Sequence, residues 1–174
     1  KVEIYKDKAI YSQDFSEGSV ASKLKKIGKS PVKNGTKITF SPDKKIFSDS
    51  CYFNPKKIYE LAKSKAFLHS GVTIDWELNK NITDKYPEVP LSESLQFKDG
   101  LKDLIKTNLN TTYNVTDDFF IGKVDFQEKF GEETIGSVEW CAIFNSFSPF
   151  IKSFCNTIPT YDGGTHQQGF LNAI

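Results

Sequence analysis

A chain of 174 residues is long enough for one globular domain or parts of two, and 38% hydrophobic with 26% charged residues is typical of a folded protein. All 23 basic residues are lysines and the formal net charge is +1, which argues against strong non-specific nucleic-acid binding by this chain alone. Because no apolar run approaches the ~18 residues of a membrane span and no signal peptide opens the chain, we expect a cytoplasmic protein without a membrane partner.

The first half of the chain is predicted to open with a hairpin over residues 1–15, turning at Lys6-Asp7-Lys8. A second strand is predicted over residues 34–40, where an Asn-Gly turn signal leads into alternating side chains. The clearest helix is predicted over residues 55–68, with Asn54 as its N-cap and a proline at its first position.

The organisation changes near Lys98-Asp99-Gly100, where a short amphipathic helix begins after a strand at 72–78 and a polar surface loop at 79–90. We therefore predict two domains, residues 1–98 and 99–174, each of α+β class. The second domain is predicted to contain three strands, at residues 119–126, 138–145 and 150–158.

A strand-to-helix junction is predicted near the end of the chain. Pro159 ends an apolar strand, and Gly163 and Gly164 are able to adopt positive φ. Thr165 is predicted to cap a helix that opens at His166. The role of this run is structural rather than catalytic.

The chain offers no credible catalytic residue or metal site. Gly28-Lys29-Ser30 imitates the end of a P-loop, but the required earlier glycine is Lys23 and no apolar strand precedes it. The two histidines, His69 and His166, lack a second ligand at zinc spacing. We predict neither a catalytic residue nor a metal ligand here.

Four runs of sequence, taken together and in order, carry a family resemblance. Residues 158–170, with Ile-Pro-Thr before Gly-Gly-Thr-His and Gly-Phe after it, closely resemble the strand-to-helix junction in the ATPase region of type IIA DNA topoisomerase B subunits. Residues 34–43, 64–74 and 97–101 are similar to the preceding segments of that family. The resemblance covers essentially the whole chain.

This resemblance implies a fold and an activity. Residues 1–98 would be the C-terminal half of a GHKL-type ATPase α/β sandwich, and residues 99–174 the first part of a transducer domain similar to ribosomal protein S5 domain 2. In this family, ATP binding dimerises two B subunits around a DNA duplex, and the transducer relays nucleotide state to the DNA-cleaving core, which involves the A subunit.

The resemblance also assigns cofactor-binding residues. Gly35 and Thr36 match a Gly-Thr pair near the adenine, and Ile38 matches an apolar residue lining the adenine pocket. Lys6 falls where the family usually has an arginine at the rim of the nucleotide pocket, and lysine lacks the planar guanidinium fork. Plain strand packing stays an alternative for Thr36 and Ile38, and simple surface exposure for Lys6.

The family's other ATP-handling groups would lie outside this chain. The catalytic glutamate, the Mg²⁺-binding asparagine and the adenine-binding aspartate would precede Lys1, and the lysine that reaches the γ-phosphate would follow Ile174. The absence of methionine and the strand-like opening also indicate an internal piece. We expect ATP and Mg²⁺ in the full subunit, but no bound cofactor and no ATP hydrolysis in this piece alone.

Two alternatives stay open. Pro159 favours bacterial topoisomerase IV, which decatenates and relaxes DNA in the cytoplasm near the nucleoid, over gyrase, which supercoils it. A non-enzymatic RNA- or protein-binding module built on the S5-like half is the other alternative. That module predicts a basic, aromatic face on residues 99–174, whereas the lysines are spread over both halves.

Overall fold

The computed structural model describes residues 1–48, 52–128, 134–147 and 149–174. Helices and strands mix along the whole chain, which confirms the α+β class. The chain divides into two units, Lys1–Phe53 and Asn54–Ile174, each described by itself. The domain boundary predicted after residue 98 falls inside the second unit and stays a prediction.

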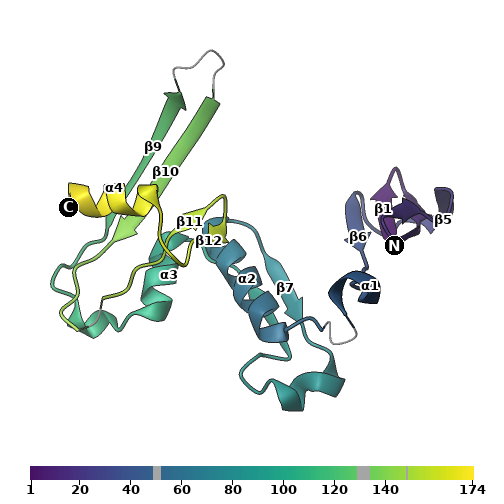
Figure 1. Cartoon of the computed structure of the whole chain (residues 1–174), viewed down its shortest axis with the longest axis horizontal. Coiled ribbons are helices and arrows are strands. Elements are labelled where there is room, and N and C mark those ends of the chain that lie inside the picture. Colours follow the sequence, from purple (N-terminus) through teal and green to yellow (C-terminus); the bar gives the residue numbers. More distant parts are fainter. Residues whose placement is uncertain (49–51, 129–133, 148) are drawn as a thin grey trace. The chain divides into compact units, whose positions relative to one another are not determined.

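The first unit contains a four-stranded antiparallel sheet with the strand order β5-β2-β1-β6 (Figure 1). The predicted hairpin is β1 and β2, and Asp7 and Lys8 in its turn have φ of 52° and 60°. Positive φ at both central residues is what a type I′ hairpin turn requires. The strands are β1 (Val2–Lys6), β2 (Ala9–Gln13), β5 (Lys25–Lys29) and β6 (Gly35–Ile38).

The sequence pattern predicts no strand at β5. Three of its five residues are lysines, and the strand carries no apolar alternation. Its partner β2 lies on one side and it has no described strand on the other, so β5 is an edge strand of this sheet. Lysine on an edge strand discourages pairing with another chain. This explains why β5 is rich in lysine and lacks the apolar alternation by which strands are predicted.

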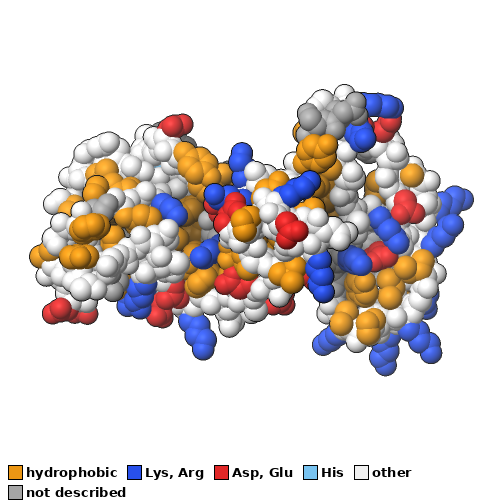
Figure 2. Space-filling view, turned by 90° about the horizontal axis from the view of Figure 1, so that it is seen from below, with side chains coloured by type: hydrophobic (Ala, Val, Ile, Leu, Met, Phe, Trp, Pro, Cys, Tyr) orange, Lys and Arg blue, Asp and Glu red, His pale blue; other side chains and the backbone are white. Residues whose placement is uncertain are grey.

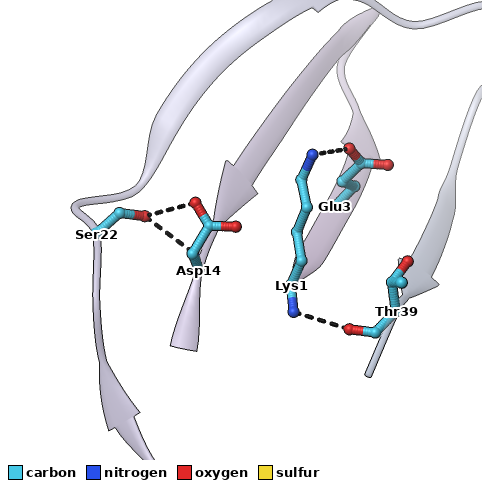
Figure 3. A network of polar contacts seen from close by, with 5 residues as sticks. All are labelled: Lys1, Glu3, Asp14, Ser22 and Thr39. Carbon is cyan, nitrogen blue, oxygen red and sulfur yellow. Dashed lines mark hydrogen bonds and ion pairs between the residues drawn. The ribbon is translucent and has the colours of Figure 1, made fainter. Parts of the chain in front are cut away.

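A small hairpin of β3 (Phe15–Ser16) and β4 (Ser19–Val20) leaves the sheet after β2. Its base is closed where the Asp14 amide donates to the Ser22 hydroxyl oxygen at 2.9 Å, as Figure 3 shows. The unit ends with the short helix α1 (Lys44–Phe47), whose first turn is capped by the Asp43 carboxylate.

The second unit begins with helix α2 (Pro55–Leu68), at the predicted bounds. Its N-cap Asn54 accepts a hydrogen bond from the Lys57 amide at 3.2 Å, as the sequence predicted. The helix packs on β7 (Ile74–Glu77), which pairs antiparallel with β8 (Ser92–Leu95). The stretch between these strands, predicted as a loop, contains a 3₁₀ helix (Lys80–Lys85). The Asn79 side-chain oxygen caps this helix by accepting a hydrogen bond from the Asn81 amide.

The core of the second unit lies around the end of α2 and the helix α3 (Leu101–Asn108). The buried Phe67 ring stacks on Phe97, with ring centroids 3.6 Å apart. The chain enters α3 through Gly100, whose φ of 55° suits glycine. Among the residues of this unit whose burial is described, the buried apolar side chains are Pro55, Ala66, Phe67, Leu78, Val89, Leu95, Leu104 and Ile105.

After α3, the described residues form two hairpins, a 3₁₀ turn and a helix. A 3₁₀ turn (Thr111–Tyr113) precedes the long hairpin of β9 (Phe120–Glu128) and β10 (Thr134–Ala142). Strand β10 begins four residues before the strand predicted at 138–145. The strand predicted at 150–158 is wrong. That segment instead makes a short hairpin of β11 (Phe154–Cys155) and β12 (Ile158–Pro159), and helix α4 (Thr165–Ala173) follows.

Candidate functional site

The register of β1 and β6 brings three of the predicted cofactor-binding residues to one face of the first sheet. Ile4 is paired with Thr36, and Val2 with Ile38. Side chains of paired residues in an antiparallel ladder share a face, and so do residues two apart on one strand. The β1–β6 strip, as we call it, therefore consists of Val2, Ile4, Lys6, Thr36 and Ile38.

The β1–β6 strip is open to solvent within its unit. Ile38 is 66% exposed and Ile4 is 38% exposed. Among the described residues, the Thr36 hydroxyl has no hydrogen-bond partner, so both its donor and its acceptor are available to a ligand. The strip thus combines exposed aliphatic surface, one hydroxyl and, at the end of β1, the ammonium of Lys6.

A side chain at position 35 would lie on the face opposite the strip, since Gly35 is paired with Tyr5. A Cβ built on Gly35 would lie 3.7 Å from Cδ2 of the Tyr5 ring, which is an ordinary van der Waals distance. The sheet itself would therefore accept a side chain at this position. Neither backbone conformation nor packing within the described residues explains the glycine.

The opposite face of β1 and β6 is charged. Glu3 is paired with Lys37 across the ladder and forms an ion pair with Lys1 at 2.9 Å (Figure 3). The hydrogen bond from Lys1 and the positive charges of Lys1 and Lys37 hold the pKa of the Glu3 carboxyl below its usual value. The apolar strip and the charged face therefore offer different chemistry to a ligand.

The predicted junction residues lie in the second unit. Gly163 has φ of 76°, a conformation that disfavours a side chain, and a Cβ there would lie 3.2 Å from the Gln167 Oε1. Gly164 has φ of 168°, which is extended backbone, so positive φ was wrong for this residue. It is instead the His166 ring, 2.8 Å from a Cβ built on Gly164, that crowds the position.

The predicted Thr165 cap is also wrong. Helix α4 begins at Thr165 itself, its N-cap is Gly164, and no side chain caps it. A glycine N-cap lacks the side-chain oxygen that would accept from the first turn, although glycine is tolerated there. The first turn is closed by the backbone, through the Gln168 amide and the Gly164 carbonyl oxygen at 2.9 Å.

The two groups of predicted site residues belong to different units, the β1–β6 strip to Lys1–Phe53 and the junction to Asn54–Ile174. The sequence pattern does not indicate Val2 and Ile4 as members of the strip. The alternation of the first strand was recognised, but only the pairing with β6 shows which face each residue shares.

The described residues fit part of a nucleotide site. An exposed aliphatic strip with a free hydroxyl suits the flat base of a nucleotide. For a metal ion, the described part of the chain contains no group of three or more His, Cys, Asp or Glu side chains that could act as ligands. A magnesium ion would need ligands from elsewhere. Among the described helices, none is long and apolar enough to cross a bilayer.

Comparison with known proteins identifies the family. Residues 100–174 match the family described as DNA gyrase B. The whole chain is similar to the DNA topoisomerase 4 B subunits of Rickettsia typhi, with 39% identity over 178 residues, and of Bartonella bacilliformis, with 38% identity over 174 residues. The chain belongs to the B-subunit family of type IIA DNA topoisomerases. It spans 25% and 24% of the lengths of these two relatives.

A solved structure from this family has a similar fold. The 43K ATPase domain of Thermus thermophilus gyrase B, in complex with an aminocoumarin, matches 99% of this chain and 43% of its own, with a TM-score of 0.73 and 27% identity. The topoisomerase IV ATP-binding domain of Francisella tularensis matches 74% of this chain and 35% of its own, with a TM-score of 0.50 and 23% identity, and supports the fold alone. The predicted fold of the B-subunit ATPase region is confirmed.

Proposed function

We propose that this chain is part of the ATP-binding subunit of a topoisomerase IV, which couples ATP-driven dimerisation to the passage of one DNA duplex through another. The observation that carries the proposal is similarity to topoisomerase 4 B subunits along the entire chain, at 38 to 40% identity to the relatives from Rickettsia and Bartonella. A module based on residues 99–174 alone would leave the similarity of the first 98 residues without a cause.

The β1–β6 strip is proposed to form one wall of the adenine pocket. Ile38 would contact the flat face of the base, and the Thr36 hydroxyl would hydrogen-bond at its edge, directly or through water. Gly35, which belongs to the opposite face of the sheet, is proposed for the same site on the family resemblance alone, and Lys6 would stand at the rim. The exposure of this strip, with its unpartnered hydroxyl, supports these roles.

Residues 99–174 are proposed to be the first part of the transducer domain, with the Gly163–His166 junction orienting helix α4. The match of residues 100–174 to the gyrase B family supports a boundary near Gly100. The proposed partners are DNA, the topoisomerase IV A subunit and a second B subunit. We place the enzyme in the bacterial cytoplasm, near the nucleoid, and propose ATP and Mg²⁺ as its cofactors.

Lysines on the described surface do not suggest an independent DNA groove. On the face shown in Figure 2, lysine side chains occur on both parts of the chain rather than along one continuous line, and acidic side chains occur on the same face. With a formal net charge of +1, the electrostatic attraction for DNA is weak. The DNA partner is therefore proposed for the assembled enzyme and not for this chain alone.

The function is tested by reconstituting the full-length parent subunit with its A subunit and assaying interlinked and supercoiled circular DNA. We expect ATP-dependent decatenation and relaxation. ATP-dependent negative supercoiling would assign the parent to gyrase instead, and no ATP-dependent change in DNA topology would overturn both assignments. The isolated chain should hydrolyse no ATP.

The adenine pocket is tested in the same parent with Thr36→Val, which removes the hydroxyl and keeps the shape. Loss of a neutral hydrogen bond should weaken nucleotide binding by about threefold to tenfold. Lys37→Met is the matched control, because Lys37 is the neighbouring residue on the opposite face of β6. Equal effects of the two variants would remove the support for a role of Thr36.

A further inference from the structure

A hydrogen bond joins helix α2 to the turn of the β11–β12 hairpin, which lies close to the junction. The Lys65 ammonium donates to the hydroxyl oxygen of Thr157, across 92 residues of sequence, and the contact is part-buried. Thr157 and its neighbour Asn156 are the two residues of the hairpin turn. A charge-assisted hydrogen bond in a partly buried place is stronger than an exposed one between neutral groups.

Packing alone fixes little of the hairpin's position relative to α2. A cavity of about 1120 Å³ is lined by Ser64 and Phe67 of α2 on one side and by Phe154, Pro159 and Thr160 on the other. Where two elements face each other across such a space, few van der Waals contacts hold them. The hydrogen bond from Lys65 to Thr157 therefore carries much of the connection.

The turn that receives this bond is conformationally demanding. Asn156 and Thr157 have φ of 46° and 70°. Asparagine tolerates positive φ, but a β-branched residue such as threonine rarely adopts it. Such a conformation persists when surrounding contacts impose it. The hydrogen bond from Lys65 is a contact of this kind, made by the side chain of the strained residue itself.

The hairpin is in turn bonded to the first turn of α4. The Ser153 hydroxyl lies 2.6 Å from the Thr160 hydroxyl and 2.6 Å from the Gln167 side-chain oxygen. The Thr160 amide also donates to the Ser153 carbonyl oxygen at 2.9 Å. Ser153 and Thr160 flank β11 and β12, so these bonds connect the base of the hairpin to the helix that follows Gly163 and Gly164.

Helix α2 is firmly placed at the other end of this chain of contacts. Asn54 caps its first turn, and its last turn is buried at Ala66 and Phe67, where Phe67 stacks on Phe97. Lys65 lies in that last turn. Its ammonium is therefore attached to a well-packed part of the second unit.

We propose that Lys65 is a positioning residue that, through Thr157 and the β11–β12 hairpin, sets the position of the first turn of α4. If the proposed function holds, the same contacts act in the enzyme. A displacement of α2 in the ATPase half would then move the β11–β12 hairpin, and with it the Gly163–His166 junction of the transducer. Lys65 touches no nucleotide in this scheme. It couples two parts of the subunit.

The first test uses amide hydrogen exchange in the 174-residue chain and does not depend on the proposed function. Lys65→Met removes the donor and keeps much of the aliphatic stem, and Thr157→Val removes the acceptor and keeps the branched shape. Each variant should speed the exchange of the Thr160 and Gln168 amides by about threefold to tenfold, because that factor corresponds to the loss of one hydrogen bond. The double variant should exchange no faster than either single one.

Lys63→Met is the matched control, since Lys63 is half-buried on the same helix and makes no hydrogen bond to the hairpin among the described residues. Lys65→Arg keeps a donor and should restore slow exchange. Unchanged exchange in Lys65→Met, or single effects that multiply in the double variant, would overturn the link. Circular dichroism of each variant shows whether it is folded.

The second test uses the full-length subunit with its A subunit. Lys65→Met should keep the ATP hydrolysis rate within about twofold of wild type. The number of DNA passages per ATP should fall by about threefold to tenfold, because that factor again corresponds to the loss of one hydrogen bond. An unchanged number of DNA passages per ATP, whether or not the hydrolysis rate itself falls, would overturn the coupling role. If the exchange result holds while the wild-type parent shows no ATP-dependent topology change, the link stands and the proposed function fails.

Discussion

The Trp140 ring of β10 lies directly over Gly122 of β9. The two residues are paired across the hairpin, and a Cβ built on Gly122 would fall 2.0 Å from Cζ2 of the indole. An aromatic ring that covers a cross-strand glycine shields backbone which the missing side chain leaves bare. The same ring is 6.3 Å, centroid to centroid, from Phe170 of α4, so it also connects the hairpin to that helix.

Gly122→Ala should therefore displace the Trp140 ring. We expect a loss of about 1 to 3 kcal/mol in the free energy of unfolding, because the methyl group overfills the site. Urea denaturation followed by tryptophan fluorescence measures it, and the folded-state emission should shift as the ring moves. Gly169→Ala is the control, since nothing lies within 4 Å of a Cβ there and alanine favours helix. Equal stability of the two variants would contradict the packing argument.

Asn54→Ala should destabilise α2. The lost bond is the one from the Lys57 amide to the Asn54 side-chain oxygen. Removal of an N-cap costs about 0.5 to 2 kcal/mol, and a value near 1 kcal/mol is expected here. Chemical denaturation monitored by circular dichroism provides the number. Asn54→Asp retains an acceptor and should remain within a few tenths of a kcal/mol of wild type, by the similar ranking of the two residues as caps.

The Tyr59 hydroxyl donates to the Glu93 carboxylate, and burial together with this bond and the carboxylate charge raises the pKa of Tyr59 from 10.0 to about 12. Below pH 10 the phenol is neutral in both folded and unfolded chains. As pH rises from 10 to about 12, the unfolded chain loses this proton first, so stability should fall across that window.

Tyr59→Phe should flatten this part of the stability profile. Thermal or urea unfolding at a series of alkaline pH values measures the slope, and ultraviolet absorbance of tyrosinate reports the titration directly. Tyr161→Phe is the control, because Tyr161 is 93% exposed. A slope that stays the same in Tyr59→Phe would show that other groups cause it.

Lys6→Arg should strengthen binding of an aminocoumarin, the inhibitor class present in the Thermus thermophilus gyrase B structure. At the proposed pocket rim, a guanidinium offers a planar fork and a stacking face that an ammonium lacks. We expect a gain of about tenfold in affinity, measured by calorimetry on the full-length subunit. Lys8→Arg, in the same hairpin turn, is the control for charge alone. A similar gain in both variants would leave Lys6 without a specific role.

Local rules determined much of this protein from its sequence. The hairpin turn at Asp7 and Lys8, and helix α2 with its Asn54 cap, form as predicted because their signals lie within a few neighbouring residues. The family resemblance can be recognised from the sequence for the same reason. It is carried by short runs of consecutive residues, such as the run around Gly163, and such runs can be compared without knowledge of the fold.

Only the tertiary structure decided which residues meet. The pairing of β1 with β6 put Thr36 and Ile38 beside Ile4 and Val2, and no local signal sets that register. Edge strand β5 was missed because edge position, not apolar alternation, shapes its lysine-rich sequence. The contact of Lys65 with Thr157 depends on a fold that closes 92 residues of chain, which a sequence pattern does not encode.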